Sequence, residues 1–135
     1  MKLNKSDLEL IEIAKEVLNQ NKDLYQKDLI VSSIVKSKSG NIYKGVNIKT
    51  SHSVCAEQVA LGQALTNGER ELDTIVAVKY NKGGGVRVVS PCGLCRYIID
   101  NLEMDINVIV EDEKTGKVLK VKASELLPYP YNRNI

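Results

Sequence analysis

Short apolar runs alternate with helix-like patterns along residues 29–127, and this alternation limits the folds open to the chain. The runs are rich in Val, Ile and Leu and are separated by turn sequences such as Ser39-Gly40-Asn41. Strands are expected at residues 29–36, 42–48, 75–80, 86–89 and 106–110, with a short edge strand at 118–121. Helices are expected at residues 55–66 and 91–102, followed by one helical turn at 123–127. A hairpin followed by such alternation predicts an α/β layered domain with a mixed sheet, because crossover helices place consecutive strands in parallel.

The first residues carry a separate helix signal. Ser6 and Glu9 have the spacing of a capping box, and apolar residues follow at helical spacing, namely Leu8, Ile11, Ala14, Val17 and Leu18. A chain of 135 residues is long enough to enclose one layered core, and it shows no linker or internal repeat. We therefore expect a single domain over residues 1–135.

Charge and hydropathy exclude some classes of partner. The formal net charge is only +2, and Lys and Arg are spread along the chain, so no field strong enough to attract nucleic acid is expected. The first seven residues lack the apolar stretch of a secretory signal, and no apolar run approaches the roughly 20 residues that span a bilayer. We expect a cytoplasmic protein that binds neither nucleic acid nor a membrane.

All three cysteines lie in two short motifs, Cys55-Ala56-Glu57 and Pro91-Cys92-Gly93-Leu94-Cys95, each at the start of an expected helix. Unpaired backbone N–H groups at a helix start lower a thiol pKa and favour the thiolate, which is the form that zinc binds. Cys92 and Cys95 can reach one ion from a single turn, while Cys55 must arrive from a different helix. Three sulfur ligands leave one tetrahedral position open for water, which is typical of a catalytic Zn²⁺ site.

Two charged residues beside these motifs complete the predicted site. Glu57 stands two residues after Cys55, where its carboxylate can take a proton from the water and pass it on, so we predict that it is the general acid/base. Three thiolates and one Zn²⁺ carry a net negative charge. Arg96 follows Cys95 directly and is the nearest cation in the sequence to balance it.

Other interpretations remain open for parts of this pattern. Taken alone, Cys92-x-x-Cys95 is also typical of a redox pair or of half a structural zinc site. His52 would close a structural site as a fourth ligand, and the chain would then be a zinc-stabilised binding module without catalytic activity. Gly83–Gly85 lacks the following helix signal and Lys-Ser/Thr pair of a phosphate-binding loop, which favours a flexible turn. We favour the catalytic interpretation because a redox pair leaves Cys55 and Glu57 without a role.

The motifs make the sequence resemble the cytidine deaminase family. The resemblance spans about residues 29–128 and rests on both cysteine motifs, Gly40, Gly45-Val46-Asn47, Arg96 and Leu126-Leu127-Pro128. The all-cysteine ligand set is similar to the small homotetrameric members of that family. The resemblance implies a three-layer α-β-α sandwich with a central mixed five-stranded sheet, one Zn²⁺ per chain held by the three cysteines, and a homotetramer.

The resemblance also implies how a substrate is held. Asn47 would bind ribose hydroxyls, the Ala56 backbone would meet the cytosine carbonyl, and the Ser90 carbonyl would accept from the amino group. Tyr129 and Tyr131 would stack on a substrate base, in this site or in a neighbouring subunit, or else belong to a frayed tail. The expected partner is therefore a small cytosine nucleoside.

Two departures from the family pattern bear on the substrate. Lys49 stands where many cytidine deaminases carry an acidic residue for the sugar, and Gln58 stands where Arg is frequent. The chain also resembles blasticidin-S deaminase, a relative that acts on an antibiotic cytosine nucleoside, in the pattern Cys-Ala-Glu-x-Val-x-Leu-Gly at residues 55–62. We predict zinc-dependent hydrolytic deamination of a free cytosine nucleoside, cytidine or deoxycytidine, with blasticidin S as the alternative substrate. Deamination of a base within nucleic acid is disfavoured by the modest charge.

Overall fold

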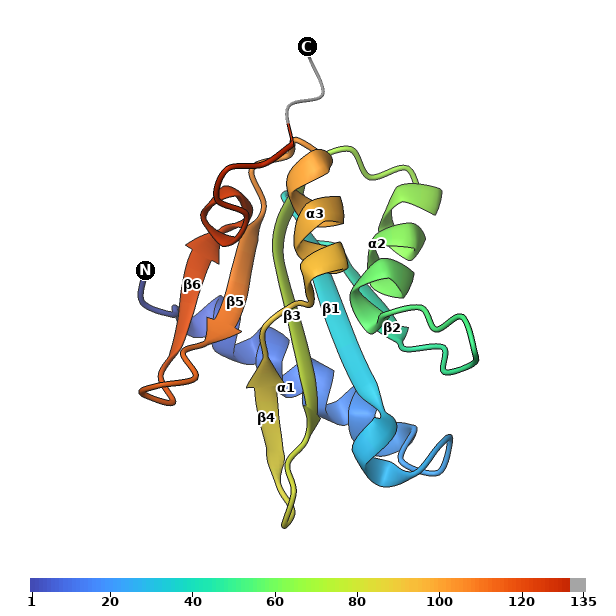
Figure 1. Cartoon of the computed structure of the whole chain (residues 1–135). Coiled ribbons are helices and arrows are strands. Elements are labelled where there is room, and N and C mark those ends of the chain that lie inside the picture. Colours follow the sequence, from blue (N-terminus) through green and yellow to red (C-terminus); the bar gives the residue numbers. More distant parts are fainter. Residues whose placement is uncertain (132–135) are drawn as a thin grey trace.

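The computed structural model describes residues 1–131, which form one sheet with helices on both faces (Figure 1). Six strands hydrogen-bond in the order β2-β1-β3-β5-β6, and β4 pairs with β3 beside that path. Their bounds are β1 (Val31–Ser37), β2 (Ile42–Val46), β3 (Leu72–Tyr80), β4 (Val86–Val89), β5 (Asn107–Glu111) and β6 (Val118–Lys122). The β3–β5 pair is parallel and the other pairs are antiparallel, so the prediction of a mixed sheet is confirmed. The sheet has one strand more than the resemblance implied, because β4 and β6 both join it.

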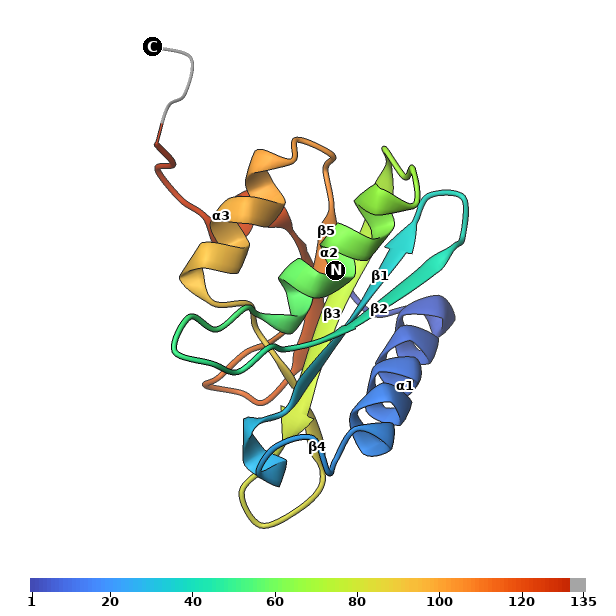
Figure 2. The same cartoon turned by 90° about the vertical axis from the view of Figure 1, so that its right-hand side faces the viewer.

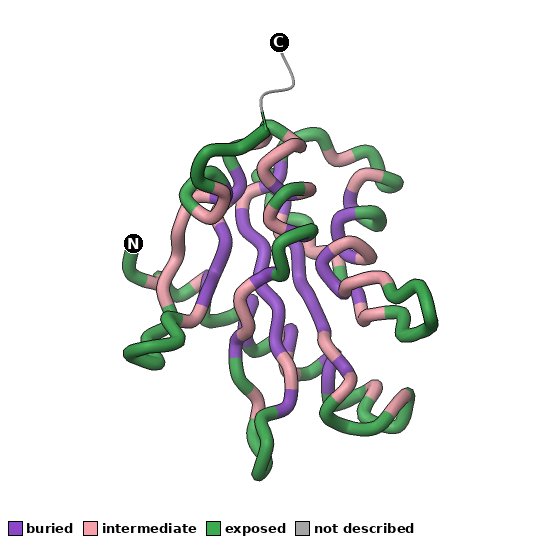
Figure 3. The backbone as a smooth tube through the Cα atoms, viewed as in Figure 1, coloured by how far each residue is buried: buried purple, intermediate pink, exposed green. Residues whose placement is uncertain are grey.

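The helices form two layers on opposite faces of the sheet, as predicted for an α-β-α sandwich (Figure 2). One face is covered by α1 (Lys5–Gln20), and the other by α2 (Ala56–Thr66) and α3 (Gly93–Asn101). Side chains of β3 alternate between the layers, so that Val76 packs with α1 while Ile75 packs with α2 and α3. The central strands are consequently buried on both faces (Figure 3). Within residues 1–131, no helix combines the length and the apolar character needed to cross a membrane.

The N-terminus of α1 differs from the sequence prediction. The capping box consists of Asn4 and Asp7, whose side chains each accept a hydrogen bond of 2.9 Å from the other residue's backbone N–H. The predicted box of Ser6 and Glu9 is wrong, because Asn4 offers an equally good cap two residues earlier. Asp7 is also tied from outside the helix, since its carboxylate lies 2.9 Å from the Lys120 ammonium and is almost fully buried. This ion pair joins α1 to β6.

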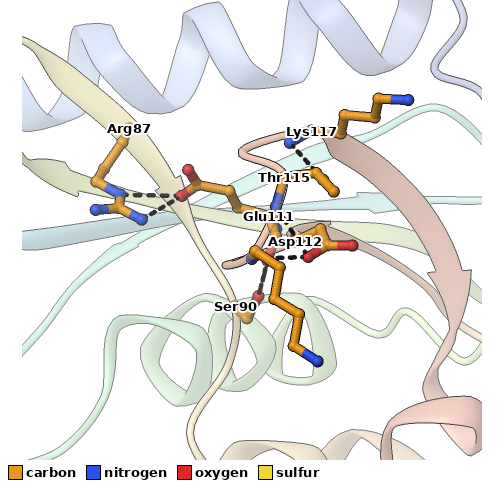
Figure 4. A network of polar contacts seen from close by, with 7 residues as sticks. Arg87, Ser90, Glu111, Asp112, Thr115 and Lys117 are labelled. Atoms are coloured by element: carbon orange, nitrogen blue, oxygen red, sulfur yellow. Dashed lines mark hydrogen bonds and ion pairs between the residues drawn. The ribbon is translucent and has the colours of Figure 1, made fainter.

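Beside β3 the sheet divides between two partner strands, β5 and β4. Residues 74–75 of β3 pair with β5, whereas residues 77–80 pair with β4, which runs back along β3. Ser90 bridges the point of division, because its Oγ donates to the Glu111 carbonyl at 3.2 Å and accepts from the Glu111 N–H at 3.3 Å. Arg87 contacts the Glu111 carboxylate through two nitrogen atoms at 2.9 and 2.7 Å (Figure 4). These contacts fix the turn that leads from β4 into α3.

The first turns of α2 lie directly on the backbone of β2 at Gly45. A Cβ atom on Gly45 would lie 2.5 Å from the Ala60 nitrogen and 2.7 Å from the Ala56 carbonyl oxygen. Both neighbours are backbone atoms of a helix, so they cannot rotate away from a side chain. The absence of a side chain at Gly45 therefore sets the distance between α2 and the sheet.

Gly45→Ala is expected to destabilise the fold by about 1–3 kcal/mol, because the added methyl group forces α2 off the sheet. Gly62→Ala is the matched control, since Gly62 lies in α2 with open space around it and alanine favours a helix by about 0.5–1 kcal/mol. Thermal unfolding followed by circular dichroism should show a lower midpoint for the first variant and an equal or higher one for the second. An unchanged midpoint for Gly45→Ala would contradict this packing.

Candidate metal centre

The three cysteines meet at the N-terminal ends of α2 and α3, which lie side by side on one face of the sheet (Figure 1). Cys55 and Cys92 are the N-cap residues of these helices, and Cys95 lies in the first turn of α3. The Sγ atoms of Cys55 and Cys92 are 3.6 Å apart, and all three sulfur atoms lie within 4.8 Å of one another. The structure thus brings the two cysteine motifs to one point.

The geometry of this cluster fits zinc. Tetrahedral coordination with Zn–S bonds of about 2.3 Å places sulfur atoms about 3.8 Å apart, close to the separation of Cys55 and Cys92. Thiolates are soft ligands of the kind that zinc prefers among the common biological cations. Within residues 1–131 the cluster consists of the three cysteines, and His52 lies in the exposed loop before α2 without joining them. The described chain therefore lacks the fourth ligand that a closed structural site needs.

The three thiols differ in their electrostatics. Burial raises the pKa of Cys55, and burial followed by the nearby Glu57 carboxylate raises that of Cys95. Partial burial acts in the same direction on Cys92, but hydrogen bonds from the Cys95 backbone and from the other two thiols outweigh it and lower the Cys92 pKa. Cys92 is thus the first thiol to ionise, and the other two retain their protons more tightly without metal.

Glu57 lies in the first turn of α2, two residues after Cys55, and is 6% exposed. Burial raises the pKa of its carboxyl group, and a backbone hydrogen bond opposes this effect only in part. No side chain among residues 1–131 forms an ion pair with Glu57. A carboxyl group in this environment can hold and release a proton closer to neutral pH than an exposed glutamate.

A cavity of about 330 Å³ lies beside the cysteines, and most of the predicted site residues line it. Its walls include six of the predicted residues, namely Asn47, Cys55, Ala56, Glu57, Ser90 and Cys92. Cys95 is fully buried behind the cavity wall. Tyr129 does not line this cavity, and its side chain is 101% exposed. The structure therefore does not bring Tyr129 to the site of its own chain.

The contacts of Arg96 and Gln58 differ from the roles assigned by sequence. The Arg96 Nε donates to the Pro91 carbonyl at 2.8 Å and so supports the turn before Cys92. Gln58 donates to the cysteine cluster instead, because its Nε2 lies 3.7 Å from the Cys95 Sγ. Gln58 is a departure from the family pattern in sequence, but its contact with Cys95 is not predictable from the sequence, because it forms only when α2 and α3 pack together.

The side chain of Asn47 is bound to the backbone of its own chain. Its Oδ1 accepts from the Val31 N–H and its Nδ2 donates to the Leu29 carbonyl, both at 2.9 Å. The Tyr25 hydroxyl donates to the Asn47 carbonyl at 3.2 Å and accepts from the Lys49 N–H at 3.0 Å. Asn47 and Tyr25 thus hold one wall of the cavity together. The sequence analysis missed Tyr25, which no short-range pattern marks.

Zinc binding by the metal-free chain is expected to release about two protons or more per ion near pH 7, because Cys55 and Cys95 hold their protons until metal replaces them. Zinc affinity should therefore fall as the pH is lowered. Isothermal titration calorimetry in buffers of different ionisation enthalpy measures the number of protons released. A zinc affinity that does not change with pH would contradict thiolate ligation.

Comparison with known proteins identifies relatives of the chain. Residues 4–111 match the family described as "Cytidine and deoxycytidylate deaminase zinc-binding region". The chain is 37% identical over 140 aligned positions to blasticidin-S deaminase of Bacillus cereus, and the alignment covers 98% of this chain and 96% of that protein. It is 32% identical over 111 positions to the cytidine deaminase of Shewanella sediminis, covering 77% of this chain but 32% of that longer protein, so it spans about a third of that relative.

The fold has relatives among solved structures as well. A crystal structure of cytidine deaminase from Burkholderia pseudomallei superimposes with a TM-score of 0.72 at 24% identity, over 96% of this chain and 100% of that one. The family match extends from α1 to the end of β5 and so contains all three cysteines and Glu57. The chain therefore belongs to the zinc-binding cytidine and deoxycytidylate deaminase family.

Proposed function

We propose that the chain hydrolytically deaminates a free cytosine nucleoside and releases ammonia. The observation that carries this proposal is the position of Glu57, a buried carboxyl group that lines the same cavity as Cys55 and Cys92. A proton carrier beside a three-thiol metal centre with an open coordination position is the arrangement that this reaction needs. Membership of the deaminase family supports the same assignment.

The reaction adds water to C4 of cytosine, breaks the bond from C4 to the amino nitrogen, and needs a proton on the departing ammonia. Bound Zn²⁺ lowers the pKa of a water molecule and so supplies a nucleophile at neutral pH. Glu57 takes one proton from the water and delivers it to the pyrimidine ring nitrogen. It then takes the second proton, from the hydroxyl group added at C4, and delivers it to the departing amino nitrogen. The raised pKa of Glu57 suits this task, because the carboxyl group must both accept and release a proton.

Two backbone groups are assigned to hold the cytosine base in the cavity. The Ala56 N–H opens α2 and has no acceptor within the helix, so it is free to donate to the cytosine carbonyl. The Ser90 carbonyl is assigned as acceptor for the amino group, and the bridge from its side chain to Glu111 keeps the backbone in place. Both assignments use backbone atoms. Apart from proline at position 56, which lacks an N–H group, any residue at these positions would provide them.

A specific observation favours blasticidin S as a second candidate substrate. The identity to blasticidin-S deaminase of Bacillus cereus is 37% over nearly the whole of both proteins, compared with 32% for the Shewanella cytidine deaminase over 77% of this chain. Lys49 lines the cavity at the place where many cytidine deaminases hold the sugar with an acidic residue. The sugar end of the substrate is therefore where the two candidates differ.

Incubation of the purified, zinc-loaded chain with cytidine, deoxycytidine and blasticidin S is expected to release ammonia from at least one of them. Ammonia release and the change in cytosine absorbance measure the reaction, and the ratio of kcat/KM values identifies the preferred substrate. Absence of turnover with all three nucleosides would overturn the proposed function.

Glu57→Gln is expected to lower kcat by roughly 10²–10⁴-fold, because the amide cannot carry the proton, while bound zinc is retained. Glu9→Gln is the matched control, since Glu9 is exposed on α1, on the opposite face of the sheet. Steady-state kinetics together with the zinc content of each protein measure the two effects separately. Full turnover by Glu57→Gln would remove Glu57 from the proposed role.

The exposed tyrosines are assigned to an assembly of several chains. Tyr129 lies outside its own cavity, and α3 presents Leu94 and Tyr97 at 58% and 40% exposure near the metal centre. We assign these apolar side chains to contacts in a homotetramer, in which Tyr129 would reach the site of a neighbouring subunit. The Tyr131 side chain is also exposed and belongs to the same segment.

A further inference from the structure

Two strands lie along the same edge of β3 without pairing with each other. β4 pairs with residues 77–80 of β3, and β5 pairs with residues 74–75. In the described part of the chain, no strand pairing or backbone hydrogen bond joins β4 to β5. These two strands therefore depend on side chains to hold them together.

Arg87 of β4 and Glu111 of β5 form such a link, which we call the clasp (Figure 4). The Nε and Nη2 atoms of Arg87 lie 2.9 and 2.7 Å from the same oxygen atom, Oε2 of Glu111. The strand register places Arg87 opposite Lys79 of β3, and like charges in such a cross-strand pair destabilise a sheet. The charge of Arg87 therefore opposes the pairing of β3 with β4, while it favours the contact of β4 with β5.

The backbone of Glu111 connects the clasp to the turn that precedes α3. The Ser90 Oγ donates to the Glu111 carbonyl at 3.2 Å and accepts from the Glu111 N–H at 3.3 Å. Both distances are at the long end for hydrogen bonds of these types, so a small shift of β5 away from β4 would break them. Ser90 is followed by Pro91 and by Cys92, the N-cap of α3. The clasp therefore keeps Glu111 where it can hold this turn.

The clasp does not touch the catalytic cavity. Arg87 and Glu111 line a groove of about 510 Å³ that is also lined by Leu8 and Ile11 of α1, whereas the metal centre lies on the face covered by α2 and α3. Neither residue of the clasp lines the catalytic cavity. Their side chains are 44% and 18% exposed, and an ion pair as exposed as this contributes little to the free energy of unfolding. An effect on the reaction can therefore be measured separately from an effect on stability.

We propose that Arg87 and Glu111 are positioning residues that act on the deamination through Ser90. This inference rests on the proposed function, which assigns the Ser90 carbonyl to the amino group of the base. While the clasp is closed, Glu111 holds the Ser90 side chain, and the Ser90 carbonyl keeps the amino group beside the metal centre. Without the clasp, the ends of β4 and β5 can separate and the carbonyl loses its fixed position. A misplacement of about 1 Å can lower a reaction rate by roughly 100-fold, even when its origin is far from the reacting atoms.

Arg87→Met is expected to lower kcat for the preferred cytosine nucleoside by roughly tenfold and to change KM by less than about threefold, because the cavity itself keeps its residues. The thermal midpoint and the zinc content should stay close to those of the parent. Arg87→Lys should restore most of kcat, because both contacts of Arg87 are made to one oxygen atom, which a single ammonium group can also bind. Steady-state kinetics of the zinc-loaded proteins measure these effects.

Lys122→Met is the matched control. It breaks another ion pair between side chains from separate segments, the 3.2 Å contact of Lys122 with Asp105, and neither residue lines the catalytic cavity or contacts Ser90. Its kcat should equal that of the parent. Unchanged kcat in Arg87→Met, a loss of kcat that follows a loss of bound zinc, or an Arg87→Lys protein as slow as Arg87→Met would overturn the inference and leave the deaminase assignment intact.

Amide hydrogen exchange tests the clasp without a substrate. The Glu111 N–H, which donates to Ser90, should exchange roughly tenfold faster in Arg87→Met, while amides in the centre of β1 keep their parent rates. An unchanged exchange rate at Glu111 would show that the clasp does not hold the turn and would overturn the inference. A parent protein that deaminates no cytosine nucleoside, yet shows the faster exchange in Arg87→Met, would contradict the proposed function and not the clasp.

Discussion

The metal centre depends on two helix N-termini that meet on one face of the sheet. α2 crosses over between the parallel strands β2 and β3, and the segment of β4 and α3 crosses over between the parallel strands β3 and β5. These crossovers alone would not align the two helix starts. The short strand β4 does so, because it runs back along β3 from residue 80 to residue 77 before α3 begins. The Ser90 bridge to Glu111 and the bare backbone of Gly45 then hold the two helices in place.

Charge balance at the centre follows from this arrangement. Three thiolates exceed the charge of one Zn²⁺, and the amide that donates to the Cys95 sulfur atom belongs to the neutral Gln58. The guanidinium of Arg96 supports the Pro91 carbonyl instead. The positive ends of two helix dipoles therefore supply much of the compensation, because Cys55 and Cys92 cap those helices. A helix terminus supplies this partial charge through fixed backbone groups, so the compensation does not depend on a mobile side chain.

The parts of the structure that depend on short-range pattern were predictable from the sequence. Periodicity predicted the three helices and the six strand segments. The two cysteine motifs indicated one site, because Cys55 and Cys92 each stand at a helix start and Glu57 lies in the first turn after Cys55. The parts that depend on long-range contacts were not. Asn4, and not Ser6, is the N-cap of α1. The capping-box residue Asp7 also forms an ion pair with Lys120, which is far away in the sequence. Likewise the amide of Asn47 and the hydroxyl of Tyr25 bind backbone groups of segments that only the folded sheet brings together.

The reaction and the choice of substrate also differ in how far a short sequence pattern predicts them. The proposed contacts with the base use backbone groups of Ala56 and Ser90 and the motif residue Glu57, all of which line the cavity, so a short motif indicates the proposed reaction. Elsewhere the cavity wall includes the charged side chains of Asp28, Lys49 and Lys79, which lie outside any motif. A substitution there changes the charge of the pocket without moving the metal or the helices. Related chains can therefore keep one reaction while their substrates diverge.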